Sequence, residues 1–101
     1  MNKIFVWIKR PGEPPRHVWV SNSLSTLQKN VGGYIETVTI EEDMVIICNE
    51  EGLLLNLPKN CNICGYELFG TIIIAGINGD EFADCPADAK AMKQLFPHLW
   101  E

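Results

Sequence analysis

Two cysteines separated by two residues form the sharpest chemical motif of the sequence, Cys61-Asn-Ile-Cys64 followed by a glycine. Two thiolates at this spacing can supply half of a tetrahedral zinc site. The other two ligands would come from Cys85 with His98 or, if the fold allowed it, from Cys48. A zinc ribbon has two such cysteine pairs and this chain has one, so reduced, partly buried thiols are the main alternative. We therefore expect no resident metal and no cofactor, and keep a small zinc-stabilised module as an alternative.

Few other residues suggest catalysis. His17 lies at the entrance of a predicted strand and His98 lies near the chain end, and histidines in such places more often pack or face solvent than act as bases. Glu36 and Glu50 could form a carboxylate pair, but their spacing does not show that they meet. Gly32-Gly33 follows a predicted helix, whereas phosphate-binding glycine loops precede one. These residues predict that the protein is not an enzyme.

The charge balance is acidic. The formal net charge is −5 and the pI is near 4.9, whereas binding to a nucleic-acid backbone requires a basic face. Lys9, Arg10 and Arg16 flank one early loop and could hold one phosphate or one acidic partner; solvated charges beside a turn are the alternative. We expect no nucleic-acid partner.

Length and hydropathy predict one domain over residues 1–101. The chain is 47% hydrophobic, which is enough to form a core. The apolar segment Ile4–Ile8 is too short for a signal peptide, and Thr71–Ile77 is too short to cross a membrane. We therefore expect a cytoplasmic protein with reduced cysteines and no membrane partner. A domain this small is marginally stable alone, so a homo-oligomer is expected.

Hydrophobic periodicity and turn residues predict two helices and several strands. The first helix covers Leu24–Val31 and ends at Gly32-Gly33, and the second starts at Asp84-Cys85-Pro86 and ends at Pro97. Residues 59–70 look like a long irregular loop. Strands are expected at 2–9, 16–20, 34–40, 44–48, 53–55 and 71–77, and a turn at 78–80 leads into Glu81-Phe82. The resulting fold class is α+β, a mostly antiparallel sheet of five or six strands with two helices packed against it.

Several short motifs carry a family resemblance. They are Val31-Gly-Gly-Tyr-Ile-Glu36, Cys48-Asn-Glu-Glu-Gly52, Leu57-Pro58 with Asn60, Phe69-Gly-Thr-Ile-Ile73 and Gly79-Asp-Glu-Phe82. With these motifs the segment from about Leu24 to Phe82 resembles a family of small proteins of unknown function that phages and integrative elements carry. The paired cysteines are not part of the family pattern, which weakens the zinc interpretation.

The resemblance implies that the protein, small and acidic, acts by binding a component of the host, either a defence protein or a small signalling molecule. Polar and aromatic motif residues at strand ends and turns fit a binding site. A helix cap at Gly32-Gly33 and a turn at residues 49–52 would explain the same motifs structurally. The candidate ligand-binding residues are Tyr34, Glu36, Asn49, Glu50 and Asn60.

These observations lead to a functional hypothesis and two alternatives. The first is a non-enzymatic binding protein of a phage or mobile element, a counter-defence protein that sequesters a small nucleotide-type signal, with a pocket at a homo-oligomer interface. An inhibitor or adaptor that docks on a host protein through its acidic and aromatic surface is the second. The zinc-stabilised module is the third.

Overall fold

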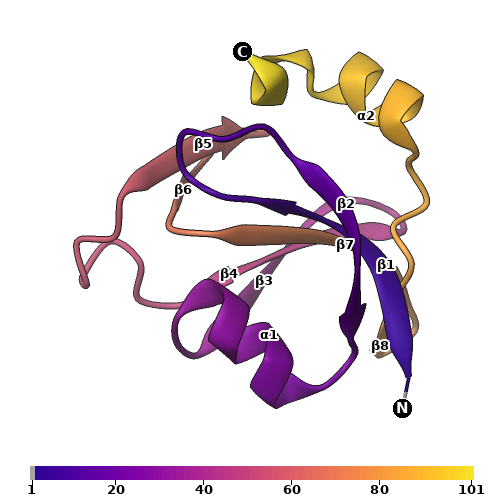
Figure 1. Ribbon diagram of the computed structural model, residues 1–101, viewed down its shortest axis with the longest axis horizontal. Helices are drawn as coiled ribbons and strands as arrows, with labels where there is room; N and C mark the ends of the chain where they lie inside the picture. Colours follow the sequence, from indigo (N-terminus) through magenta and orange to yellow (C-terminus); the bar gives the residue numbers. More distant parts are fainter. Residues whose placement is uncertain (1) are drawn as a thin grey trace.

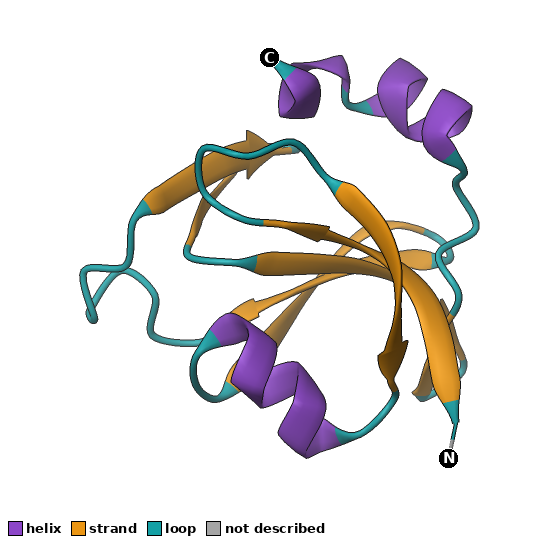
Figure 2. Ribbon diagram, viewed as in Figure 1, coloured by secondary structure: helices purple, strands orange, loops and turns teal. Residues whose placement is uncertain are grey.

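The computed structural model describes residues 2–101, which form a six-stranded sheet, a separate two-stranded hairpin, two α-helices and a short 3-10 helix (Figures 1 and 2). All the strand pairings are antiparallel, so the predicted α+β class is confirmed. In chain order the elements are β1 (Lys3–Lys9), β2 (Arg16–Ser21), α1 (Leu24–Val31), β3 (Ile35–Glu41), β4 (Met44–Asn49), β5 (Lys59–Ile63), β6 (Tyr66–Phe69), β7 (Ile72–Asn78), β8 (Glu81–Ala83), α2 (Ala89–Leu95) and η1 (Pro97–Trp100).

The main sheet has the strand order β2-β1-β7-β4-β3, and β8 also pairs with β7. The two central strands β4 and β7 are the most apolar of the chain. Every residue of β4 is buried, as are the first five of β7. A strand that is covered on both faces must be apolar on both faces, which explains the unbroken apolar segments of the sequence.

The two faces of the sheet are covered by different layers, and α1 and α2 lie on opposite sides of the sheet (Figure 1). On one face α1 inserts Leu27 and Val31. On the other face lie the β5–β6 hairpin, α2 and η1, which contribute Ile63, Leu68, Met92, Phe96 and Leu99. No helix within residues 2–101 is long and apolar enough to cross a bilayer.

Helix α1 has the expected bounds and caps. The backbone N–H of Thr26 donates to Ser23 Oγ at 3.3 Å, which caps the helix N-terminus. Gly32 ends the helix with a φ of 82°, a left-handed conformation that glycine adopts without a steric penalty. The predicted helix from Leu24 to Val31 is therefore confirmed.

Helix α2 begins later than expected. The Asp84 carboxylate accepts a 2.8 Å hydrogen bond from the Phe5 backbone N–H, and the Cys85 N–H donates to the Phe5 carbonyl at 2.8 Å. These two bonds hold residues 84–85 along β1, so a helix cannot start there. The cap is Asp88, whose Oδ1 accepts from the Ala91 N–H at 2.9 Å.

The apolar segment Leu53–Leu55 is not a strand, and that prediction is wrong. It lies in the turn over residues 50–56, in which Asn56 has a positive φ of 56°. The three leucine side chains are 68%, 82% and 53% exposed. Hydropathy alone cannot distinguish apolar residues that fill a core from apolar residues held at a surface.

Residues 59–70 are not an irregular loop, and this prediction is also wrong. They form the β5–β6 hairpin, in which Cys61 is opposite Leu68 and Ile63 is opposite Tyr66. The two turn residues, Cys64 and Gly65, both have positive φ values of 52° and 87°. Two consecutive left-handed residues make the tight turn that suits the natural twist of a hairpin.

A column of aromatic rings covers the β1–β2 pair on the face opposite α1. His17 stacks between Phe5 and Trp7, with ring centroids 3.6 Å and 4.2 Å apart, and Trp19 stacks on the other side of Phe5 at 4.8 Å. Burial lowers the pKa of His17 despite the attraction of two nearby aspartates. His17 is thus a packing residue of the edge hairpin.

Candidate functional site

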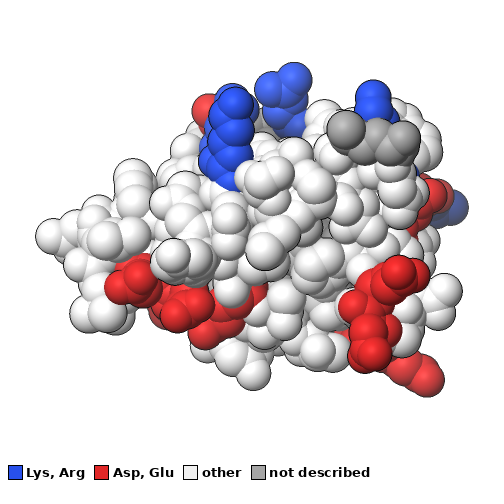
Figure 3. Space-filling view, turned by 90° about the horizontal axis from the view of Figure 1, so that it is seen from below, with Lys and Arg blue, Asp and Glu red and all other residues white. Residues whose placement is uncertain are grey.

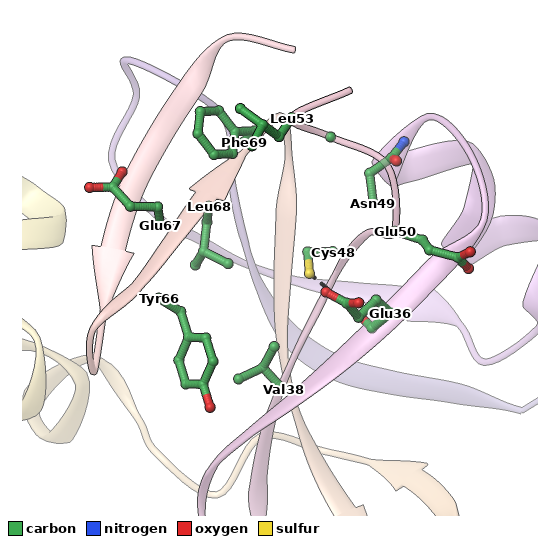
Figure 4. A pocket seen from close by; sticks show the side chains of 11 residues that line it. Glu36, Val38, Cys48, Asn49, Glu50, Leu53, Tyr66, Glu67, Leu68 and Phe69 are labelled. Atoms are coloured by element: carbon green, nitrogen blue, oxygen red, sulfur yellow. Dashed lines mark hydrogen bonds between the residues drawn. The ribbon is translucent and has the colours of Figure 1, made fainter. Parts of the chain in front are cut away.

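A hollow of about 260 Å³ lies between the end of the β3–β4 pair and the β5–β6 hairpin (Figure 4). Glu36 and Cys48 lie on one side of it, and Tyr66 and Leu68 of β6 lie on the opposite side. Apolar side chains form most of its interior, and every charged residue in the lining is a glutamate. The remaining lining residues are Val38, Asn49, Glu50, Gly52, Leu53, Glu67 and Phe69.

The pairing of β3 with β4 forms the first wall. Glu36 lies directly opposite Cys48 in this register, and Val38 projects from the same face of β3 because it is two residues further on. The Cys48 thiol donates a weak hydrogen bond to the Glu36 backbone carbonyl at 3.6 Å. Since β3 is an edge strand, the wall opens to solvent on the Glu36 side.

The hairpin and the turn after β4 form the second wall. Ile63 and Leu68 hold the hairpin on the sheet, with exposed fractions of 0% and 4%. Gly52 lets the turn pass close to β6, because a Cβ at this position would lie 3.2 Å from the Phe69 carbonyl oxygen. The glycine of the Cys48–Gly52 motif therefore has a structural role in closing this side of the hollow.

Cys48 brings a thiol to the hollow. Burial, and to a lesser degree the neighbouring Glu36 carboxylate, raise the pKa of Cys48 to about 11. The thiol is therefore protonated at neutral pH, whereas the thiolate is the form that attacks electrophiles and binds metals. In this state Cys48 serves as a small apolar wall residue.

The rim of the hollow is acidic. Glu36 and Glu50 have no ion-pair partner within residues 2–101. Glu67 points away from the hollow (Figure 4), and its carboxylate pairs with the Lys59 ammonium at 3.3 Å. The rim thus carries two unpaired negative charges beside apolar walls, an arrangement that attracts a cation attached to an apolar body.

The acidic rim belongs to a wider separation of charge across the sheet. Among the charged side chains visible in Figure 3, most lysines and arginines lie along the upper side of the view and most acidic residues along the lower side. The strand order explains this, because the basic residues of β1 and β2 lie at one edge of the sheet and β3 lies at the other. The acidic residues of β3 and of the turns at both ends of β4 are Glu36, Glu41, Glu42, Asp43, Glu50 and Glu51.

Three of the five predicted ligand-binding residues, Glu36, Asn49 and Glu50, line the hollow. Asn49 is only 7% exposed and its side-chain amide is already occupied. Its Nδ2 donates to the Val31 carbonyl at 3.1 Å, and its Oδ1 accepts from the Glu51 N–H at 2.7 Å. Asn49 therefore ties the end of β4 to the end of α1, and these backbone groups fix the orientation of its amide.

Tyr34 and Asn60 do not line the hollow. The Tyr34 ring is 68% exposed, just before β3. The Asn60 Nδ2 donates to the carbonyls of Lys9 and Gly70, both at 2.8 Å, and its Oδ1 accepts from the Lys9 ammonium at 2.9 Å. Asn60 thus joins β5 to the main sheet, and neither it nor Tyr34 lies with the three candidate residues that line the hollow.

The residues of the alternative zinc set are not brought together. Within residues 2–101 no group of three histidine, cysteine or acidic side chains is placed to hold a metal ion. Cys64 is exposed in the hairpin turn and Cys85 is buried beside β1. The His98 Nε2 lies 2.7 Å from the Asn62 carbonyl oxygen, which fixes its ring against the hairpin.

Sequence reasoning missed the apolar half of the site. Val38 and Cys48 belong to predicted strands and look like core residues, and Tyr66, Leu68 and Phe69 belong to the segment 59–70 that was predicted to be irregular. The exposed leucine turn, defined as Leu53–Leu55, adjoins the hollow through Leu53. One signal in the sequence could have indicated this exposed turn. The three consecutive leucines are followed by Asn56-Leu57-Pro58, and a short apolar segment bounded by turn residues is compatible with a surface turn as well as with a strand.

A family model described as "Domain of unknown function (DUF3846)" matches residues 2–97 of the chain. No curated protein and no solved structure matches it.

Proposed function

The chain belongs to the DUF3846 family, and we propose that it is a non-enzymatic binding protein that docks on a partner protein. The partner segment carries a lysine or arginine next to apolar residues. The observation that carries the proposal is the hollow itself, whose apolar interior opens between unpaired Glu36 and Glu50 and continues into the leucine turn. In this role the protein would be an inhibitor or adaptor of its partner.

Surface energetics support a protein partner. Removing one leucine side chain from water contributes roughly 1.5–3 kcal/mol, and the leucine turn exposes three of them. Contiguous exposed apolar residues with a polar rim are typical of interaction sites. The hollow of about 260 Å³ is small for a drug-sized ligand but suits one anchoring side chain of a partner.

The charge of the rim defines the partner. A basic segment would be attracted by Glu36 and Glu50, and complementary charges of this kind raise the association rate and exclude acidic competitors. The phosphates of a nucleotide-type signal would instead be repelled here. Sequestration of such a signal remains a prediction that this hollow does not favour.

The proposed setting follows from the motif resemblance. In a phage or mobile element, a small acidic protein of this kind would act in the host cytoplasm by occupying a host protein. A homo-oligomer remains a prediction. The protonated Cys48 supports a role without covalent chemistry.

Selection of random displayed peptides tests the proposal while leaving the identity of the partner open. We expect enrichment of sequences in which lysine or arginine adjoins leucine, isoleucine or an aromatic residue. The variant Glu36→Gln/Glu50→Gln should not enrich them, whereas Glu41→Gln/Glu42→Gln should. The control pair makes the same charge change at the far end of β3, away from the hollow. Enrichment of acidic peptides, or equal enrichment by both variants, would contradict the proposal.

A further inference from the structure

A second hollow, of about 210 Å³, lies beside the loop that joins β1 to β2. We propose that it binds a small ligand that carries a phosphate or carboxylate group next to a hydrogen-bond donor. The site is separate from the acidic hollow and does not depend on the proposed protein partner. Its lining consists of Ile8, Arg10, Glu13, Pro14, Arg16 and Val18.

The register of the β1–β2 hairpin brings the two arginines together. Ile8 is directly opposite Arg16, so both side chains project from the same face of the sheet. Arg10 follows Ile8 by two residues, where the chain turns, and the Glu13 N–H donates to the Arg10 carbonyl at 3.1 Å. Lys9 points to the opposite face, where its ammonium binds Asn60. Of the three cations of this segment, two therefore face one hollow.

Neither arginine has a partner for its charge. Within residues 2–101 no hydrogen bond, ion pair or ring contact involves the guanidinium of Arg10 or Arg16. By contrast, Lys59 pairs with Glu67 and Lys93 lies over the Trp100 ring. Two guanidinium groups around one hollow repel each other unless an anion lies between them. Their planar donor arrays match the paired oxygens of phosphate and carboxylate groups.

The rest of the lining restricts the ligand further. Glu13 places a carboxylate in the same wall, which would repel a bare anion but accept a hydrogen bond from a hydroxyl or ammonium group beside it. Ile8, Pro14 and Val18 provide apolar contact. A sugar phosphate and an α-amino acid both combine an oxyanion with an adjacent donor. If the ligand is a sugar phosphate, the two arginines would recognise its phosphate group. A nucleotide-type signal would need such recognition, and the acidic hollow does not offer it.

Titration of the labelled protein with ribose 5-phosphate, inorganic phosphate and L-alanine, followed by backbone amide chemical shifts, tests this site. We expect saturable shifts at Ile8 and Val18 with at least one probe. The responding probe distinguishes a phosphate ligand from an amino acid. Arg10→Gln and Arg16→Gln should each weaken binding by about tenfold or more, because each removes charge-assisted hydrogen bonds.

Lys29→Gln is the matched control, since it removes one positive charge from an exposed position on α1 outside the lining. It should leave the affinity nearly unchanged. The proposal is overturned if none of the three probes gives saturable shifts at these amides. Equal loss of binding in the Lys29 and arginine variants would also overturn it, since the attraction would then reflect net charge alone.

Discussion

Replacing Asn60 by alanine is expected to lower the free energy of unfolding by about 2–4 kcal/mol. The Asn60 amide makes three hydrogen bonds, two that join β5 to Lys9 of β1 and one to the carbonyl of Gly70, the residue that follows β6. One of these bonds is to the ammonium group of Lys9, a residue that is only 6% exposed. After the substitution the one hydrogen bond left to this buried charge within residues 2–101 would be a long contact of 3.4 Å to the Arg10 carbonyl.

Denaturation by urea, followed by circular dichroism, measures this effect. Asn62→Ala is the control in the same strand, because Asn62 is exposed and its side chain accepts one hydrogen bond, from the Gly65 N–H at 3.1 Å. It should cost below about 1 kcal/mol. In a Lys9→Met background the Asn60 substitution should cost less, since no buried ammonium remains. A loss at Asn60 no larger than that at Asn62 would mean that Asn60 does not hold the hairpin.

The second large effect is expected at the acidic rim. Glu36→Lys/Glu50→Lys should weaken the binding of a selected basic peptide by about 100-fold, because each change removes an attraction and adds a repulsion. Both glutamates are exposed and neither forms an ion pair within residues 2–101. The stability of the protein should therefore change little. Titration calorimetry at physiological salt measures the affinity.

Glu41→Lys/Glu42→Lys makes the same change in net charge at the other end of β3. It should weaken binding only a few-fold, because the distance and the salt screen the interaction. If both double variants lose affinity equally, the peptide responds to overall charge and the hollow is not its site.

The elements that were predicted correctly are those in which local and tertiary preferences agree. The residues of β4 and β7 are apolar on both faces because both faces are covered, and Ser23 and Gly32 have the residue types that cap α1. The β5–β6 hairpin lacks such a signal. Only Ile63 and Leu68 of its strand residues are buried, and its register shifts between Lys59 and Cys61, so no regular alternation appears.

The sequence identified only part of the candidate site, because residues with similar sequence patterns have different tertiary roles. Glu36 and Glu50 were identified as polar motif residues near strand ends, and they do lie at one hollow. Asn49 and Asn60 have the same appearance in the sequence, but their amides satisfy backbone groups of distant segments. Gly33 illustrates this coupling, because a Cβ there would lie 2.9 Å from Asn49 Nδ2. A polar residue that joins two segments and one that binds a ligand cannot be distinguished before the tertiary contacts are known.

Mapping a selected basic peptide onto the labelled protein by backbone amide chemical shifts tests the central claim most directly. We predict that the largest shifts occur at Glu36, Cys48, Leu53 and Tyr66, with saturation at the affinity measured by calorimetry. Shifts centred on α1 or on the arginine-lined hollow, or spread evenly over the surface, would contradict the assignment of the acidic hollow as the docking site.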